Sequence, residues 1–225
     1  MPRLSIVVPT LMESSTIADC LEPLQGARAS GCELVVVDGG SSDDTVAQAD
    51  RLADVVLSSA SGRAQQMNAG WRAATGARVA FLHADTRMDE RHVDALLAVE
   101  AGAWGRFDVR LSSDRPAFRV IEQAINIRSR LTRLATGDQV LFADRELLEA
   151  TGGFPEIPLM EDLSFCRTLR RLKRPRFLRP PVVTSSRRWE RNGVLRTILL
   201  MWRLRLAWSL GADPAGLADR YRHAR

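Results

Sequence analysis

The sequence has little cysteine, no low-complexity tract and no long apolar stretch at its start. Its three cysteines, an odd number without CxxC spacing, exclude a disulfide framework and a cysteine-based zinc site. The first few residues enter a strand-like run at once, which leaves no room for the apolar core of a secretory signal peptide. Free thiols and the lack of an export signal lead us to expect a protein of the reducing cytoplasm.

The composition is that of a folded globular protein with a basic balance. Hydrophobic residues make up 45% and charged residues 26% of the 225, which excludes a disordered or collagen-like chain. Lysine and arginine, mostly arginine, outnumber aspartate and glutamate by 32 to 27, a formal charge of +5. Because arginine binds phosphate oxygens in pairs, charge alone would allow nucleoside diphosphates, anionic lipids and nucleic acids as partners.

Strand-like and helix-like segments alternate through the first half of the chain. Residues 4–8 and 33–37 are β-branched apolar runs typical of buried parallel strands, and a segment with helical spacing lies between them. The predicted strands are 4–8, 33–37, 54–57 and 78–82, and the predicted helices are 14–24 (N-cap Ser14 or Ser15), 41–52, 64–75 and 90–100. This order predicts a doubly wound, Rossmann-like, mostly parallel α/β sheet with ligands beyond the carboxyl ends of its strands.

The regular alternation ends in the second half. There the pattern predicts strands at 104–111, 139–143 and 181–185 and helices at 115–135 and 161–172. No repeat or linker divides the chain, so we expect a single domain over residues 1–225. Within it, residues 1–103 would form a nucleotide-binding half, 104–190 an acceptor and catalytic half, and 191–225 a helical tail.

Two aspartates follow predicted strands at the expected binding edge of the sheet. Asp38 ends the second strand beside Gly39, where a carboxylate could contact a base or ribose or could equally cap the next helix. Asp85, in the tripeptide that begins at His83, follows the fourth strand and could hold a divalent cation that also binds phosphate oxygens. The alternative for this tripeptide is a simple turn, because a single carboxylate is a weak metal signal.

Two further pairs of residues lie in the second half. Glu161 and Asp162 open a predicted helix, where a carboxylate can face a cleft as a general base or can merely stabilise the positive end of the helix dipole. Arg188 and Trp189 follow the last predicted strand. The arginine would suit a diphosphate, and the alternative is a solvated basic turn with the indole in the core.

Taken in order, these segments resemble glycosyltransferases of family 2, which have the GT-A fold, over about Ser5 to Trp189. Two positions depart from the family pattern. Met12 stands where asparagine often precedes the family's glutamate, and His83 stands where the first acid of a DxD motif would be. The motifs that carry the resemblance are SIVVPT at 5–10 followed by Glu13, VVVDGGSSDDT at 35–45, GRAQQMNAG at 62–70, HAD at 83–85, GDQ at 137–139, ED at 161–162 and SSRRW at 185–189.

The resemblance implies a site for a nucleoside-diphosphate-sugar donor. The donor-binding residues that it implies are Pro9, Thr10, Glu13, Asp38, Gly39, Arg63, Asn68, His83, Asp85, Arg188 and Trp189. Asp85 would also be the ligand of Mg²⁺ or Mn²⁺. Asp162 would be the catalytic base of an inverting displacement, with Glu161 as an acceptor contact or as the base itself. The acceptor, a lipid, a saccharide or a small molecule, stays open.

Two other functions fit parts of the sequence. A nucleotidyltransferase shares the architecture, but it would need a basic, glycine-rich loop after the first strand, and residues 9–15 form no such loop. A non-enzymatic basic module could use the arginine-rich residues 187–225 to bind membrane or nucleic acid. No nucleic-acid-binding motif is present, so we expect no nucleic-acid partner.

The apolar run at 194–210 is interrupted by Arg196, Arg203 and Arg205, and charges at a bilayer centre are costly. At 100° per residue, Arg203 and Arg205 point to opposite sides, so the run lacks a single basic face. A packed C-terminal helix is the favoured prediction. Peripheral contact with a membrane stays open as the alternative.

Overall fold

The structure, a computed structural model, describes residues 3–223 except the side chains of Arg188 and of residues 222 and 223. The strands are β1 (Leu4–Thr10), β2 (Glu33–Asp38), β3 (Val55–Ser58), β4 (Arg78–Phe81), β5 (Thr86–Arg87), β6 (Trp104–Leu111), β7 (Leu141–Asp144) and β8 (Arg176–Thr184). The helices are α1 (Ile17–Leu21), α2 (Gln25–Ala29), α3 (Thr45–Leu52), α4 (Arg63–Ala73), α5 (Glu90–Leu97), α6 (Pro116–Thr132), α7 (Arg145–Thr151), α8 (Glu161–Leu172), α9 (Arg187–Asn192), α10 (Val194–Ser209) and α11 (Pro214–His223), with 3₁₀ turns η1 (Glu22–Leu24) and η2 (Gly137–Gln139).

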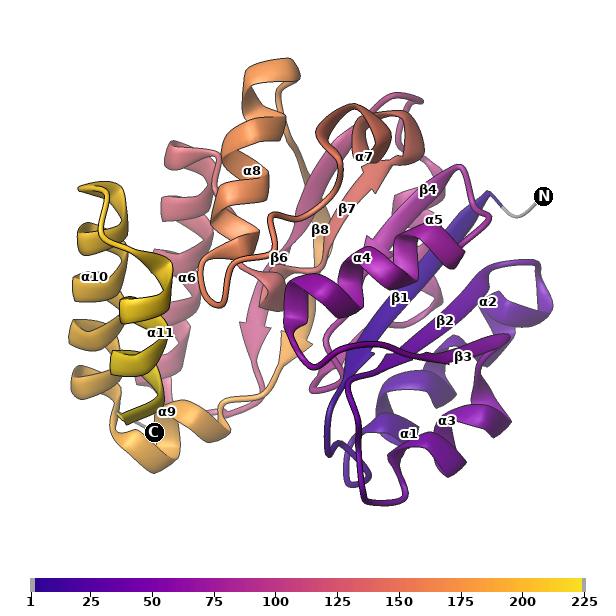
Figure 1. Cartoon of the computed structure of the whole chain (residues 1–225), viewed down its shortest axis with the longest axis horizontal. Helices are drawn as coiled ribbons and strands as arrows, with labels where there is room; N and C mark the ends of the chain where they lie inside the picture. Colours follow the sequence, from indigo (N-terminus) through magenta and orange to yellow (C-terminus); the bar gives the residue numbers. More distant parts are fainter. Residues whose placement is uncertain (1–2, 224–225) are drawn as a thin grey trace.

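These strands form one eight-stranded sheet in the order β3-β2-β1-β4-β7-β6-β8-β5 (Figure 1). From β3 to β4 neighbouring strands are parallel, whereas β7 is antiparallel to both of its neighbours. β6 and β8 are parallel, and β5 pairs with β8 in the antiparallel sense. The predicted α/β fold with a mostly parallel sheet is confirmed, and β7 is where the regular first half gives way to the second.

Helices cover both faces of the sheet, because successive side chains of a strand point to opposite sides. In β1, Leu4, Ile6 and Val8 pack in one cluster with side chains of α1, α3 and α5. Val7 packs in a second cluster with side chains of α4, α7 and α8. Burial on both faces explains why β1 is a continuous apolar run in the sequence.

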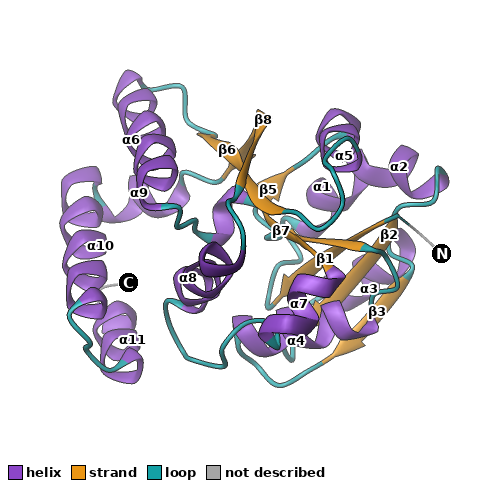
Figure 2. Cartoon of the chain, turned by 90° about the horizontal axis from the view of Figure 1, so that it is seen from above, coloured by secondary structure: helices purple, strands orange, loops and turns teal. Residues whose placement is uncertain are grey.

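The C-terminal helices gather with α6 at one end of the molecule, beyond β6 and β8 (Figures 1 and 2). α6 packs on β6 through Phe118 and Ile121. α10 packs through Leu204 and Trp208 in a cluster that includes side chains of α8 and α11. α10 is therefore the packed helix that the sequence predicted, and within residues 3–223 no helix combines the length and apolarity needed to cross a membrane.

Two helices begin later than predicted because the loops that precede them bind each other. α1 begins at Ile17 rather than at residue 14, and α3 begins at Thr45 rather than at residue 41. The backbone N–H groups of Met12, Glu13 and Ser14 donate to side chains of residues 41–45 instead of starting a helix. β5 and α7 lie outside every predicted element. β8 begins at Arg176, earlier than predicted, because prolines are uncommon inside strands and the two in β8 made its first half look unlike one.

Candidate functional site

The loops after β1 and β2 form one wall of the site. The strands pair in parallel so that Thr10 lies opposite Asp38, at the carboxyl end of each. Asp38 is 3% exposed, and its carboxylate accepts hydrogen bonds from the N–H groups of Gly40 and Ser41 at 2.9 and 2.8 Å. α3 begins beyond this turn, so Asp38 shapes the loop rather than capping the helix. Its predicted contact with a nucleoside stays a prediction.

Gln66, which was not predicted from the sequence, holds the ends of β1 and β2 in this wall through its buried side chain. Its side-chain amide donates to the carbonyl oxygens of Thr10 at 2.6 Å and Val37 at 3.0 Å. A Cβ atom at Gly39 would lie 3.1 Å from this amide, a tight contact that glycine avoids. Pro9 and Thr10 are buried at the end of β1, and they therefore set the path of the loop that follows.

Asp85 lies where three segments of the site come together. Burial raises the pKa of its carboxyl, the negative charges of Glu13 and Asp138 add to the rise, and the positive charges of Arg187 and Arg63 oppose it. The backbone carbonyl of Asp85 accepts a hydrogen bond of 3.1 Å from the N–H of residue 185, which ties its loop to the end of β8. Asp85 therefore faces acidic groups of the first loop and of η2.

Glu161 and Asp162 open α8 and are both buried. Asp162 accepts hydrogen bonds from the N–H of Leu163 at 2.7 Å and from the N–H of Gly137, in η2, at 3.0 Å. Glu161 forms an ion pair of 3.3 Å with Arg63 of α4. Burial raises the pKa of Asp162 to about 6, and the negative charge of Glu161 adds to the rise. Because Asp162 also binds the backbone of η2, the two acids do more than stabilise the start of α8.

Gly137 joins the two acidic segments of the site. Its N–H binds Asp162, and a side chain added at this glycine would collide with the imidazole of His83. The charge of Arg63 acts on both Asp85 and Asp162. The HAD loop, η2 and the start of α8 therefore meet at one place, although they are far apart in the sequence. Asp38 belongs to the adjoining wall.

Asn68 supports the site from inside the protein. It lies in the middle of α4, and it is 1% exposed. Its amide donates to the carbonyl of Phe154 at 2.8 Å and accepts from the N–H of Phe154 at 2.9 Å and from the indole N–H of Trp71 at 3.2 Å. Asn68 thus fixes the loop before α8, and its predicted donor contact stays a prediction.

The late basic segment was predicted to contribute Arg188 and Trp189 to the donor site. The side chain of Arg188 lies outside the described residues. Trp189 packs against the cluster of Phe118 and Ile121 and anchors α9. Arg187 is exposed, and its positive charge acts on Asp85, as does that of Arg63.

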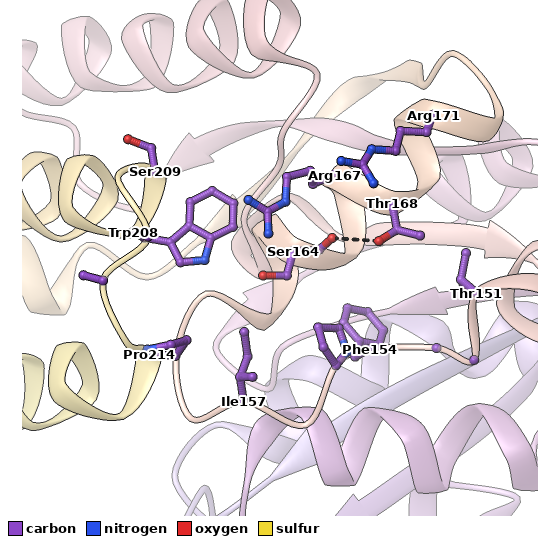
Figure 3. Close-up of a pocket in the computed structure, with 15 residues that line it drawn as sticks. Thr151, Phe154, Ile157, Ser164, Arg167, Thr168, Arg171, Trp208, Ser209 and Pro214 are labelled. Atoms are coloured by element: carbon purple, nitrogen blue, oxygen red, sulfur yellow. Dashed lines mark hydrogen bonds between the residues drawn. The ribbon is translucent and has the colours of Figure 1, made fainter.

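A separate cavity of about 600 Å³ opens between α8, the loop before it and the turn between α10 and α11 (Figure 3). Arg167 and Arg171 of α8 line it, and Trp208 stands at its far side, with the Arg167 guanidinium 4.5 Å from the indole ring centre. None of the predicted site residues lines this cavity. It is therefore distinct from the place where Asp85 and Asp162 meet.

Comparison with known proteins gives the fold and family. The mannosyltransferase PcManGT from Pyrobaculum calidifontis, in complex with GDP-Man and Mn²⁺, superposes with a TM-score of 0.64 at 24% identity, over 99% of this chain and 70% of that chain. S. aureus TarS 1-349 in complex with UDP-GlcNAc gives 0.66 at 20% identity, over 82% and 58%. At such identities the likeness shows the fold alone, and that fold is GT-A, as predicted.

Sequence comparison is more specific. A PGL/p-HBAD biosynthesis glycosyltransferase of Mycobacterium bovis is 32% identical over 108 residues, which are 45% of this chain and 42% of that protein. The chain thus spans less than half the length of this relative. The family model described as Glycosyl transferase family 2 matches residues 5–142, more than half of the chain. The chain belongs to glycosyl transferase family 2.

Proposed function

We propose that this chain transfers a sugar from a nucleoside-diphosphate sugar to an acceptor hydroxyl, with inversion at the anomeric carbon and with Asp162 as the general base. One observation carries the assignment of the base. Asp162 is a buried carboxylate, held by the N–H groups of Leu163 and Gly137, whose pKa is raised to about 6. A base whose pKa is near the working pH is ionised yet still basic enough to take a proton.

The reaction is a single displacement. The acceptor hydroxyl gives its proton to the Asp162 carboxylate while its oxygen forms a bond to the anomeric carbon. The bond from that carbon to the diphosphate oxygen breaks, and the electron pair leaves with the nucleoside diphosphate. Glu161 is ion-paired with Arg63, so its negative charge is already partly compensated. This difference favours Asp162 over Glu161 as the base.

The donor is assigned to the walls formed by the first two loops and the HAD loop. Support comes from the family and from the GDP-Man and UDP-GlcNAc bound in the two structurally similar proteins, PcManGT and TarS. In this chain, Arg63 and Arg187 place positive charge beside Asp85. Guanidinium groups suit the oxygens of a departing diphosphate, which gains negative charge as the bond breaks.

A divalent cation, Mg²⁺ or Mn²⁺, fits the residues around Asp85. The described residues contain no cluster of three or more metal-binding side chains, but Mg²⁺ is commonly held by one or two carboxylates together with substrate phosphates. Glu13 and Asp138 make the surroundings of Asp85 acidic, which a cation would relieve. Asp85 would hold the ion, with His83 beside it, and a bound ion would neutralise charge on the diphosphate.

A thermal-shift screen tests the proposal. Nucleoside diphosphates and their sugars are added with and without Mn²⁺, since a ligand that binds only the folded state raises the melting temperature. We expect one nucleotide series to stabilise the protein and Mn²⁺ to increase the effect. Release of nucleoside diphosphate from the stabilising sugar nucleotide then identifies transfer, whereas release of pyrophosphate from the matching nucleoside triphosphate would identify a nucleotidyltransferase.

A further inference from the structure

Two arginines that the proposed reaction does not use lie close enough to the acids of the site to feel their charge. Arg128 comes from α6 and Arg205 from α10, and both side chains are half-buried. The negative charges of Asp138 and Asp162 act on both guanidinium groups. The two helices stand next to each other (Figures 1 and 2), so they bring two cations to one side of the catalytic base.

Both guanidinium groups have hydrogen-bonding capacity that the protein leaves unfilled. Nη2 of Arg128 and Nε of Arg205 are shielded from solvent and have no hydrogen-bond partner, and the same holds for Oδ1 of Asp138. Burial, and after it the positive charge of Arg205, lower the pKa of Arg128 to about 10. The two positively charged guanidinium groups thus repel each other, and each has an N–H donor without a hydrogen-bond partner.

Compensation of the nearby acids does not explain this arrangement. Within the described part of the chain, neither arginine comes within the 4.0 Å of a carboxylate that defines an ion pair. The two oxygens of Asp162 already accept from the backbone of Gly137 and Leu163. Buried donors of this kind are normally bound, so a ligand is the partner that completes them.

We propose that Arg128 and Arg205 form an acceptor subsite for a phosphate group, with Asp138 accepting a hydrogen bond from a hydroxyl of the same acceptor. The inference rests on the proposed function, because it takes Asp162 as the base that separates donor and acceptor. A phosphate monoester carries close to two negative charges at neutral pH, which matches two guanidinium groups. The donor diphosphate is assigned to Arg63 and Arg187, whose positive charges act on Asp85.

Phosphate binding with the donor site filled tests this subsite. Glycerol 3-phosphate is titrated calorimetrically into protein saturated with Mn²⁺ and the nucleoside diphosphate chosen by the screen, and vesicles of phosphatidylcholine with phosphatidic acid form a second arm. We expect Arg128→Gln and Arg205→Gln each to weaken phosphate binding at least about ten-fold while leaving nucleotide binding unchanged. Arg51→Gln, an exposed position on α3, is the matched control.

The outcomes separate this inference from the proposed function. If the unaltered protein binds no nucleotide, the proposed donor site is refuted. The phosphate subsite is then tested by phosphate binding to the nucleotide-free protein. Nucleotide binding without any phosphate binding, or phosphate binding that both arginine variants retain, overturns the subsite. Binding of glycerol 3-phosphate indicates a free phosphate acceptor. Binding in the vesicle arm alone, weakened by both Arg128→Gln and Arg205→Gln, indicates a lipid-borne one.

A second, independent observation concerns the outer faces of α6 and α10. Each helix carries a row of exposed apolar side chains at the spacing of one helical face. Each of these side chains is more than half exposed: Val120, Ile127 and Leu131 on α6, Leu195, Leu199, Trp202 and Leu206 on α10, and Leu210 directly after α10. The two helices lie next to each other at one end of the molecule (Figures 1 and 2), so the rows share that end. This set is called the α6–α10 face below.

Exposed arginines lie on these helices or directly beside them. They include Arg115, Arg133, Arg191, Arg196 and Arg203, whereas the exposed acids among the described residues of 114–133 and 187–210 are Asp114 and Glu190. The sequence pattern suggested opposed arginines on α10. In the structure Arg205 turns inward to the acids, whereas Arg203 is exposed. The objection that the helix lacks one outer basic surface is therefore removed.

The geometry points to docking of the α6–α10 face on an anionic membrane surface. Apolar side chains including a tryptophan, bordered by arginine, suit the boundary between acyl chains and anionic headgroups. A second copy of the chain is the competing occupant. Pairing of two such faces would bring arginines against arginines, and this repulsion would weaken the dimer. An anionic membrane would instead attract the arginines.

Co-sedimentation with vesicles tests the docking. We expect binding to vesicles of phosphatidylcholine and phosphatidylglycerol, and at least about ten-fold weaker binding to phosphatidylcholine alone or in high salt. Leu199→Asp with Leu206→Asp should abolish binding, whereas the control Leu172→Asp, at an exposed apolar position of α8, should not. Equal binding by the double variant, no binding by the unaltered protein, or a dimer in ultracentrifugation that the double variant dissolves overturns the inference.

Discussion

Replacing Asp162 by asparagine should remove activity and at the same time make the protein more stable at neutral pH. The pKa of Asp162 is raised from 3.8 to about 6 in the folded protein. At a pH above both values the carboxylate is charged in either state, and the raised pKa corresponds to about 3 kcal/mol of lost stability. Asparagine keeps the shape without the charge but cannot accept both backbone hydrogen bonds, which costs about 1 kcal/mol. The net gain should be about 1–2 kcal/mol.

The difference in unfolding free energy between the variant and the unaltered protein depends on pH and can be measured directly. As the pH rises from about 4 to about 7, the unaltered protein must give up the proton that the folded state holds more tightly, so its stability falls relative to the variant. Below about pH 4 Asp162 is neutral in both states and the advantage disappears. Urea unfolding of both proteins at a series of pH values measures this difference.

Turnover provides the second readout for Asp162→Asn. Loss of a general base should lower kcat by about 10²–10⁴, while binding of the nucleotide donor stays within about two-fold. In the unaltered enzyme, kcat should rise with pH through the pKa of Asp162, near 6. A variant that retains turnover, or a stability difference that does not change with pH, would refute the assignment of Asp162 as a buried base.

Three further substitutions address other parts of the site. Asp85→Asn should abolish the additional stabilisation that Mn²⁺ gives to the nucleotide complex, and a thermal shift unchanged by the substitution would contradict its role as metal ligand. Gly137→Ala should lower both the melting temperature and kcat, because the added methyl group collides with the His83 imidazole; wild-type values in both assays would show that this contact is unimportant. Asn68→Ala leaves the backbone of Phe154 without its buried partners and should destabilise the protein by about 2–4 kcal/mol in urea unfolding. Donor affinity of folded Asn68→Ala should stay unchanged, and a selective loss of affinity would instead return Asn68 to the donor site.

The regular part of the fold was predictable because its signals are local. A strand buried on both faces is a continuous apolar run, so β1, β2 and β4 were found within a few residues of their ends. The starts of α1 and α3 were not, because residues 12–14 and 41–45 hydrogen-bond to each other across the sheet edge. Such partners are distant in the sequence, and capping preferences alone would place the helix starts earlier.

The candidate site divides in the same way. Asp85 and Asp162 could be proposed from motifs, but the residue that joins their segments, Gly137, acts through a backbone N–H and through the lack of a side chain. No residue-type pattern reports such a role. Arg128 and Arg205 were missed for a related reason: each lies in a helix rich in arginine, and only the packing of those helices turns these two inward.

The distribution of charge leads to a last expectation about how ligands share the site. The donor side carries Glu13 and Asp85, which act on each other unfavourably, whereas the acceptor side carries Arg128 and Arg205. A nucleoside diphosphate is itself an anion, so its approach to the donor side depends on a cation that offsets both sets of negative charge. Removing divalent metal with EDTA should therefore weaken nucleotide binding strongly and leave glycerol 3-phosphate binding almost unchanged in calorimetry. Equal sensitivity of the two ligands to EDTA would mean that they occupy the same electrostatic environment, and the division into a donor side and an acceptor side would then be wrong.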